Sequence, residues 1–90
     1  MKIDVSKFGK TLISRPVGRD VCLSARAYTI PKDSTEVIEL DFSNVQVLTP
    51  SWADEFMCGL RDELGASRIE VIEGENWSVK TAFDTLRASI

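Results

Sequence analysis

The side chains best suited to chemistry lie between residues 41 and 55. Three carboxylates in this stretch, Asp41, Asp54 and Glu55, are of the kind that bind Mg²⁺ or transfer protons. No histidine, no reactive cysteine setting and no glycine-rich phosphate loop accompanies them, although acid–base and nucleotide sites ordinarily combine such groups. We therefore expect no catalytic residue, no cofactor and no metal. A small enzyme or nucleotide-binding protein that uses Asp41 and Asp54 is the alternative.

Two hydroxyl groups, those of Thr49 and Ser51, flank Pro50 in the same stretch. Serine and threonine are preferred as helix N-caps, and proline is favoured at the first helical position. With Ser51 as the cap, Asp54 falls at the third helical position, as in an acidic capping box. We expect caps. Phosphorylation of Ser51 or Thr49 is the minor alternative, because Asp54 and Glu55 would repel an added phosphate.

The two tryptophans are candidate contact residues with different expected roles. Trp52 lies about 100° around its helix from the centre of the apolar face, so we expect a half-exposed side chain suited to an interface. A role in sealing the rim of the core is an equal alternative. Trp77 lies nearly opposite the apolar stripe of the last helix, but a cap at Ser78 would let it staple to Ala82. We favour that structural role for Trp77.

A strand, a polar turn and a helix must position these groups. Residues 36–42 contain an apolar run with β-branched residues, which is typical of a central strand covered on both faces. The following helix repeats apolar residues at spacings of three and four and ends at Gly65. Its predicted apolar face consists of Ala53, Phe56, Met57, Leu60 and Leu64.

The remaining segments predict an α/β fold with the order β-β-α-β-α-β-α. Residues 2–6 and 11–14 suggest a hairpin that turns at Gly9, and a first helix runs from a Ser14 cap to about Tyr28. A turn over residues 31–34, a strand over 68–72 and a third helix follow. The crossover rule then gives a four-stranded mixed sheet, the hairpin plus parallel central strands, with three helices mainly on one side. The third helix aligns Val79, Ala82, Phe83, Leu86 and Ile90.

Within this frame, Leu40-Asp41-Phe42, Val45 and residues 48–56 resemble the central motif of STAS-like domains, small modules named after sulfate transporters and anti-sigma factor antagonists. The closest likeness is to an uncharacterised STAS-like branch. Residues 79–84 are similar to the last helix of an anti-sigma factor antagonist, so the resemblance covers residues 1–90 as one domain. It implies a non-catalytic regulatory module that binds a protein partner, such as a histidine-kinase-type ATPase, through the loop and N-terminus of the second helix.

In the antagonists, a serine before the second helix is phosphorylated by the partner kinase. Alignment through Val45 and Leu48 places Pro50 at that acceptor position and Thr49 at the preceding aspartate. The usual acceptor is therefore absent from this chain, and Ser51 stands beside it.

Partners of open α/β sheets bind beyond the carboxyl ends of the parallel strands, where helix N-termini offer unpaired amides. Arg15 is expected to face this rim. A homodimer formed through the hairpin edge, with Leu12 and Ile13, is a further alternative to the partner-binding rim. The residues expected to bind the partner are Asn44, Thr49, Pro50, Ser51, Trp52, Glu55 and Asn76.

Composition narrows the class of protein. The 90 residues are 43% hydrophobic and 28% charged, with a net charge of −3 and a pI of about 4.8; a balance of this kind indicates a globular domain without a basic surface for nucleic acid. No apolar run near 18 residues and no signal peptide is evident. Cys22 and Cys58 lack metal-ligand spacing. We expect a soluble, cytoplasmic protein with reduced thiols, a monomer or weak homodimer, that binds neither membrane nor nucleic acid directly.

Overall fold

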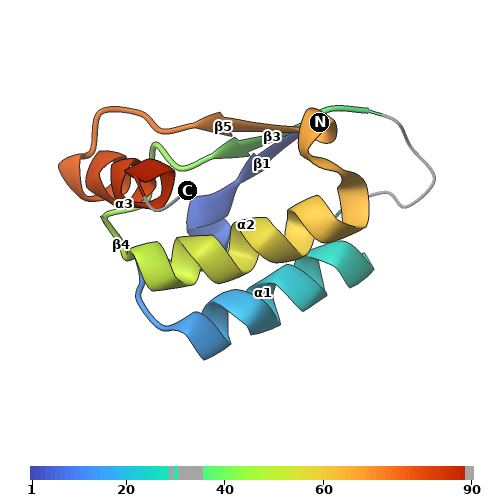
Figure 1. Ribbon diagram of the computed structural model, residues 1–90, viewed down its shortest axis with the longest axis horizontal. Helices are drawn as coiled ribbons and strands as arrows, with labels where there is room; N and C mark the ends of the chain where they lie inside the picture. Colours follow the sequence, from blue (N-terminus) through green and yellow to red (C-terminus); the bar gives the residue numbers. More distant parts are fainter. Residues whose placement is uncertain (29, 31–35, 89–90) are drawn as a thin grey trace.

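The computed structural model describes residues 1–28, 30 and 36–88, which form an α/β fold with three α-helices in these ranges (Figure 1). The predicted fold class is confirmed. The predicted turn at residues 31–34 and the position of Ile90 lie outside the described residues. The elements in chain order are β1 (Lys2–Asp4), the 3-10 helix η1 (Val5–Phe8), β2 (Thr11–Leu12), α1 (Arg15–Tyr28), β3 (Ile38–Asp41), β4 (Val47–Leu48), α2 (Pro50–Leu64), the 3-10 helix η2 (Ala66–Arg68), β5 (Ile69–Ile72) and α3 (Trp77–Ala88).

The strands form two parallel sheets, with the orders β1-β3-β5 and β2-β4. The predicted N-terminal hairpin is wrong, because β1 pairs with β3 and β2 pairs with β4. The Asp4 carboxylate accepts a hydrogen bond from the Ser6 amide, which turns the chain into η1 and carries it to the second sheet. The hairpin edge on which the homodimer alternative depended is therefore not formed.

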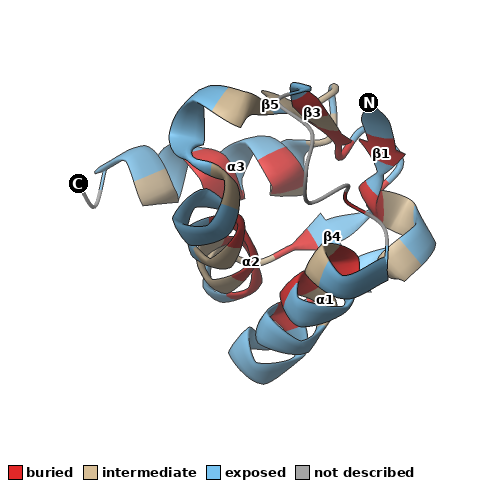
Figure 2. Ribbon diagram, turned by 90° about the vertical axis from the view of Figure 1, so that its right-hand side faces the viewer, coloured by how far each residue is buried: buried red, intermediate tan, exposed pale blue. Residues whose placement is uncertain are grey.

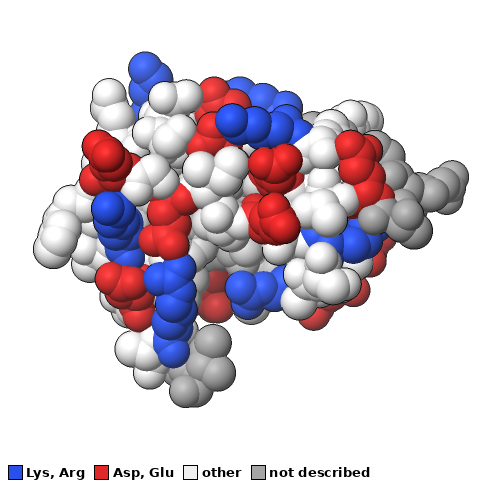
Figure 3. Space-filling view, turned by 90° about the horizontal axis from the view of Figure 1, so that it is seen from above, with Lys and Arg blue, Asp and Glu red and all other residues white. Residues whose placement is uncertain are grey.

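The three-stranded sheet has one apolar and one charged side. Ile3, Leu40 and Val71 lie in register and face the core, whereas Lys2, Glu39 and Glu70 form the neighbouring row. Helices α1 and α2 lie beneath the sheet in Figure 1, and acidic and basic groups are interspersed on the opposite side (Figure 3). Strand β3 is central as predicted, but the prediction that it is covered on both faces is wrong.

Helices α1 and α2 pack closely because glycines lie at their contact. A Cβ atom at Gly18 would lie 2.8 Å from the Trp52 carbonyl oxygen, and one at Gly59 would lie 2.5 Å from the Cys22 sulfur. No larger residue fits either place without a shift of the neighbouring group. The outer side of α1 is exposed, as Figure 2 shows. Helix α2 is consequently covered on two sides, by the sheet and by α1.

The helix ends follow the predicted signals in most places. The Ser14 hydroxyl accepts a hydrogen bond from the Val17 amide at 3.3 Å, and Gly65, with a φ of 85°, ends α2. Thr49, not Ser51, is the cap of α2: the helix begins at Pro50, and the Thr49 hydroxyl accepts from the Trp52 amide. Asp54 therefore lies beyond the first turn, and the predicted capping box is wrong. None of the described helices has both the length and the apolar character needed to cross a membrane.

Candidate functional site

Segments far apart in the sequence meet at the N-terminal end of α2. We call residues 13–15, 46–52 and 76–78 the α2 corner. It lies at the left in Figure 1, where α1, α2 and α3 all begin. The Thr49 hydroxyl donates to the carbonyl oxygen of Ile13 at 2.5 Å, and the Asn76 amide nitrogen donates to the carbonyl oxygen of Gln46 at 3.1 Å. Hydrogen bonds therefore join the loops at this end of the molecule, as expected for loops that share one rim.

The same polar side chains also cap the helices. The Asn76 side-chain oxygen accepts hydrogen bonds from the amides of Ser78 at 2.8 Å and Val79 at 3.3 Å. Asn76 is therefore the cap of α3, and the predicted cap at Ser78 is wrong. The Ser78 hydroxyl instead accepts from the Leu48 amide at 3.0 Å and donates to the Leu48 carbonyl oxygen at 3.2 Å. The corner thus uses its polar groups internally, in place of the unpaired amides expected at this rim.

Trp52 is not a contact residue, because none of its surface is exposed (0%). Its ring stacks on Phe56 with centroids 4.8 Å apart, and Gly18 of α1 lies against it. The prediction of a half-exposed side chain considered only one apolar face of α2. Helix α1 covers a second side of α2 and encloses the tryptophan.

Trp77 is the exposed aromatic residue of the corner, with 81% of its surface accessible. The predicted staple onto Ala82 is wrong, because the Asn76 cap makes Trp77 the first residue of α3. The position of Trp77 opposite the apolar stripe was the signal that pointed to this exposure. Ile13, Val47 and Ser51 are further exposed residues of the corner.

The other predicted contact residues are divided between two places. Thr49, Pro50 and Asn76 are half-buried parts of the corner. Glu55 is also half-buried and binds Arg15 at 3.0 Å. Asn44 is exposed but belongs to a different group, because its amide nitrogen donates to Asp4 at 3.3 Å.

Arg15 bridges the beginning of α1 to α2. Its guanidinium lies 2.9 Å from the Asp54 carboxylate and 3.0 Å from that of Glu55. Hydrogen bonds from Arg15 and then from the Cys58 thiol hold the pKa of Asp54 below its ordinary value. Arg15 therefore faces α2 and neutralises part of the negative charge of Asp54 and Glu55, the two acids that were expected to repel a phosphate.

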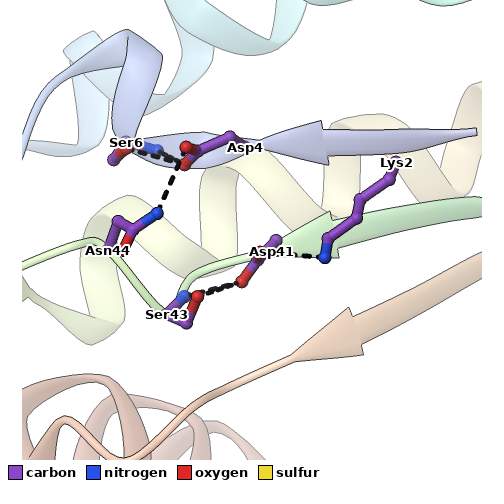
Figure 4. A network of polar contacts seen from close by, with 6 residues as sticks. All are labelled: Lys2, Asp4, Ser6, Asp41, Ser43 and Asn44. Carbon is purple, nitrogen blue, oxygen red and sulfur yellow. Dashed lines mark hydrogen bonds and ion pairs between the residues drawn. The ribbon is translucent and has the colours of Figure 1, made fainter.

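A second polar cluster lies where β1 and β3 end (Figure 4). Asp4 and Asp41 are register partners on these strands. Each carboxylate accepts two hydrogen bonds from the serine two residues later: Asp4 from the Ser6 amide at 3.0 Å and hydroxyl at 2.6 Å, and Asp41 from the Ser43 amide at 2.9 Å and hydroxyl at 2.6 Å. The repeated Asp-x-Ser spacing was visible in the sequence and was missed.

This cluster keeps two acids ionised and turns the chain out of the sheet. Hydrogen bonds from Ser6 lower the pKa of Asp4, and those from Ser43, with the Lys2 ammonium 3.5 Å away, lower the pKa of Asp41. Asp41 is only 8% exposed. Carboxylates that already accept several hydrogen bonds favour the charged form and make weak proton donors.

Asp41 and Asp54, the pair considered for catalysis, have separate partners. Asp41 binds Ser43 and Lys2, whereas Asp54 binds Arg15 and accepts a hydrogen bond from Cys58. Within the ranges that the structure describes, no group of three or more histidine, cysteine or acidic side chains is placed to hold a metal ion.

Comparison with known proteins identifies one matching family. Residues 28–77 match the sequence model of a family described as a STAS-like domain of unknown function (DUF4325). The matched span runs from the end of α1 through β3, β4, α2 and β5 to Trp77. No curated protein and no solved structure matches the chain.

Proposed function

The chain belongs to the family of STAS-like domains of unknown function, and we propose that it is a non-catalytic regulatory module that binds another protein through the α2 corner. Membership of this family points to an anti-sigma-factor-antagonist-like regulatory fold. The observation that carries the proposal is the exposure of Trp77 at the beginning of α3.

The corner has the physical character of a protein interface. Tryptophan is among the residues that contribute most to binding when a partner covers them, and Val47 and Ile13 add exposed apolar surface to the same corner. The helix ends beside them are already capped by Thr49 and Asn76. A partner that covers this surface would therefore leave few polar groups without hydrogen bonds, which keeps the cost of desolvation low.

The partner that we propose to test first is a histidine-kinase-type ATPase. This class follows from the resemblance to anti-sigma factor antagonists, whose second helix begins at the contact with such a kinase. The exposed residues Ser51 and Trp77 give the corner a polar and an apolar part.

The test compares two exposed aromatic residues. Trp77→Ala should weaken binding to the purified ATPase by about 30-fold or more, because truncation of a central interface tryptophan typically costs about 2 kcal/mol. Tyr28→Ala is the matched control: Tyr28 is 88% exposed and ends α1 at the opposite end of the molecule from the corner. Isothermal titration measures both affinities, and unfolding curves show whether each variant remains folded. Equal affinities for the Trp77→Ala variant and the unsubstituted protein would refute the proposal.

Phosphorylation at the corner would give the module a switch, and the geometry favours Ser51 over Thr49. The Thr49 hydroxyl both donates to Ile13 and accepts from Trp52, whereas Ser51 is exposed at the second position of α2. A phosphate there would be stabilised by the positive end of the helix dipole. Protein purified from cells that contain its kinase should carry a phosphate on Ser51 by intact-mass and peptide analysis, and Ser51→Ala should abolish it. An unmodified Ser51 in that sample would contradict the switch.

A further inference from the structure

A pocket of about 320 Å³ lies between α2, β5 and α3, away from the α2 corner. Its walls are two helix faces with β5 between them. The α2 face carries Met57, Cys58 and Arg61, and the α3 face carries Phe83 and Arg87. The volume is within the range of about 300–1,000 Å³ found for small-molecule sites, at its lower end. The occupant must therefore be small.

The inner surface of the pocket is apolar. Met57 and Phe83 are buried core residues, and Val71 and Leu86 are partly buried residues packed against that core. A site of this kind gains binding free energy by covering exposed hydrocarbon. The body of the occupant should therefore be an aromatic ring or a branched aliphatic group.

Charge at the mouth of the pocket defines the other end of the occupant. Arg87 is already paired with Glu73 and Asp84, and Asp54 is paired with Arg15. In the described part of the chain the Arg61 guanidinium makes neither a hydrogen bond nor an ion pair, and Asp54 attracts it only over a longer distance. Arg61 is therefore the charged group of the mouth that lacks a direct partner, and it suits an anion.

The carboxylate of the occupant is expected at the Arg61 end of the pocket, away from the Asp54 carboxylate. Asp54 and Arg61 are seven residues apart on α2, which corresponds to about 10 Å along the helix axis. We propose that this pocket binds a small organic acid with an apolar body, oriented with its carboxylate toward Arg61. The proposal is independent of the α2 corner, because the argument for partner binding uses none of the residues that line this pocket.

The probe is 4-phenylbutyrate, and its amide is the neutral control. The acid should give saturable shifts in the backbone amide resonances of Cys58, Arg61 and Phe83, with a dissociation constant in the millimolar range expected for a ligand of this size. The neutral amide should bind about tenfold more weakly, because it lacks the charged hydrogen bond to the arginine. Equal binding of acid and amide would overturn the assignment of Arg61, and no saturable shift with the acid would overturn the site.

Two arginine variants separate the pocket from general charge effects. Arg61→Gln should weaken binding of 4-phenylbutyrate about tenfold, whereas Arg19→Gln, at an exposed position of α1 that does not line this pocket, should leave binding unchanged. Both residues are exposed, so neither variant is expected to unfold the protein. Equal loss in the two variants would refute a specific carboxylate site.

Cys58 supplies a second readout, because it lines the pocket and is exposed, while Cys22 is buried. Burial, together with the hydrogen bond that the thiol donates to Asp54, raises the pKa of Cys58, so alkylation by iodoacetamide should be measured at mildly alkaline pH. Saturating 4-phenylbutyrate should slow alkylation of Cys58, and the Arg61→Gln variant should lose this protection at the same concentration. Alkylation at the same rate with and without the acid would contradict occupancy of the pocket.

Discussion

Trp52 and Trp77 both lie in the first turn of a helix, shortly after a polar cap, yet their surroundings are opposite. Trp52 is the third residue of α2 and has no exposed surface, whereas Trp77 is the first residue of α3 and is 81% exposed. Position after the cap accounts for part of this difference. The rest comes from the neighbours, since α2 packs against both the sheet and α1, while α3 buries the single stripe of Val79, Ala82 and Phe83.

The difference shows that the side chain of a residue at the edge of an apolar face is buried only where a neighbouring element covers that part of the helix, as Gly18 of α1 does at Trp52. Helix α1 encloses Trp52 on α2, whereas Trp77, at the beginning of α3, remains exposed.

Trp52→Ala should lower the free energy of unfolding by about 3–5 kcal/mol, the cost of removing a large buried aromatic side chain. Urea denaturation measures the loss. Trp52→Phe is the control, because it keeps a ring at this position and removes the buried indole nitrogen that has no hydrogen-bond partner in the described structure. It should cost less than about 1.5 kcal/mol. A loss below about 1 kcal/mol for Trp52→Ala would be too small for a core residue.

Gly18→Ala should cost about 1–3 kcal/mol, because the added methyl group would lie 2.8 Å from the backbone of Trp52 and force α1 away from α2. Arg19→Ala is the neighbouring control, at an exposed position, and should change stability by less than about 0.5 kcal/mol. Urea denaturation of both variants provides the measurement. Similar stabilities for the two variants would show that α1 does not enclose Trp52 tightly.

Thr49→Ala should cost about 1–2 kcal/mol, because it removes the cap of α2 and the hydrogen bond to Ile13. Asn76→Ala should cost a similar amount, about 1–2 kcal/mol, because it removes the cap of α3 and the hydrogen bond to Gln46. Thermal unfolding compares the two variants with Thr49→Ser, which keeps the hydroxyl group and should lose little. A loss below about 0.5 kcal/mol in either alanine variant would show that its cap does not stabilise the helix.

Acid should lower the free energy of unfolding by a smaller amount, through the ion pair between Arg15 of α1 and Asp54 of α2. The pKa of Asp54 is lowered in the folded protein by Arg15, so the folded state binds fewer protons than the unfolded state. The stabilisation is complete above the ordinary pKa of the carboxyl group and is lost progressively below about pH 5. Urea midpoints across this range should fall less steeply in Arg15→Met than in the unsubstituted protein. Parallel curves would mean that the ion pair does not stabilise the fold.

Trp77→Ala should have the smallest effect, a change of less than about 0.5 kcal/mol in the free energy of unfolding. Fluorescence sharpens the contrast. In Trp52→Phe the remaining emission comes from Trp77 and should be readily quenched by acrylamide, whereas in Trp77→Phe it comes from Trp52 and should be shielded. Equal quenching in the two variants would contradict the difference in exposure.

Local patterns in the sequence predicted most of the elements and their order, because spacing of apolar residues and capping residues act within a single segment. The hairpin was wrong because alternation in residues 2–6 predicts a strand but not the strand with which it pairs. Thr49 was not singled out as the cap of α2, because two hydroxyl groups flank Pro50, although a proline at the first helical position favours the residue before it.

The candidate site was harder to predict, because its chemistry depends on contacts between distant segments. A helical wheel of α2 contains no information about Gly18, so it could not decide between a half-exposed Trp52 and one that seals the core, which is its actual position. The pocket beside Arg61 needs α3 opposite α2, and the two Asp-x-Ser turns meet only when β1 pairs with β3. For Trp77, by contrast, the helical wheel alone pointed to exposure, and the supposed staple overrode it.

The Ser78 hydroxyl fixes how far α3 can slide along its own axis. One oxygen atom pairs with both the amide and the carbonyl of Leu48, so a shift of the helix by even a fraction of a turn breaks two hydrogen bonds at once. The residue beside Trp77 is therefore tied to β4, and Leu48 of β4 lies two residues before the first residue of α2. The Ser78 hydroxyl thus connects the beginning of α3 to the strand that leads into α2.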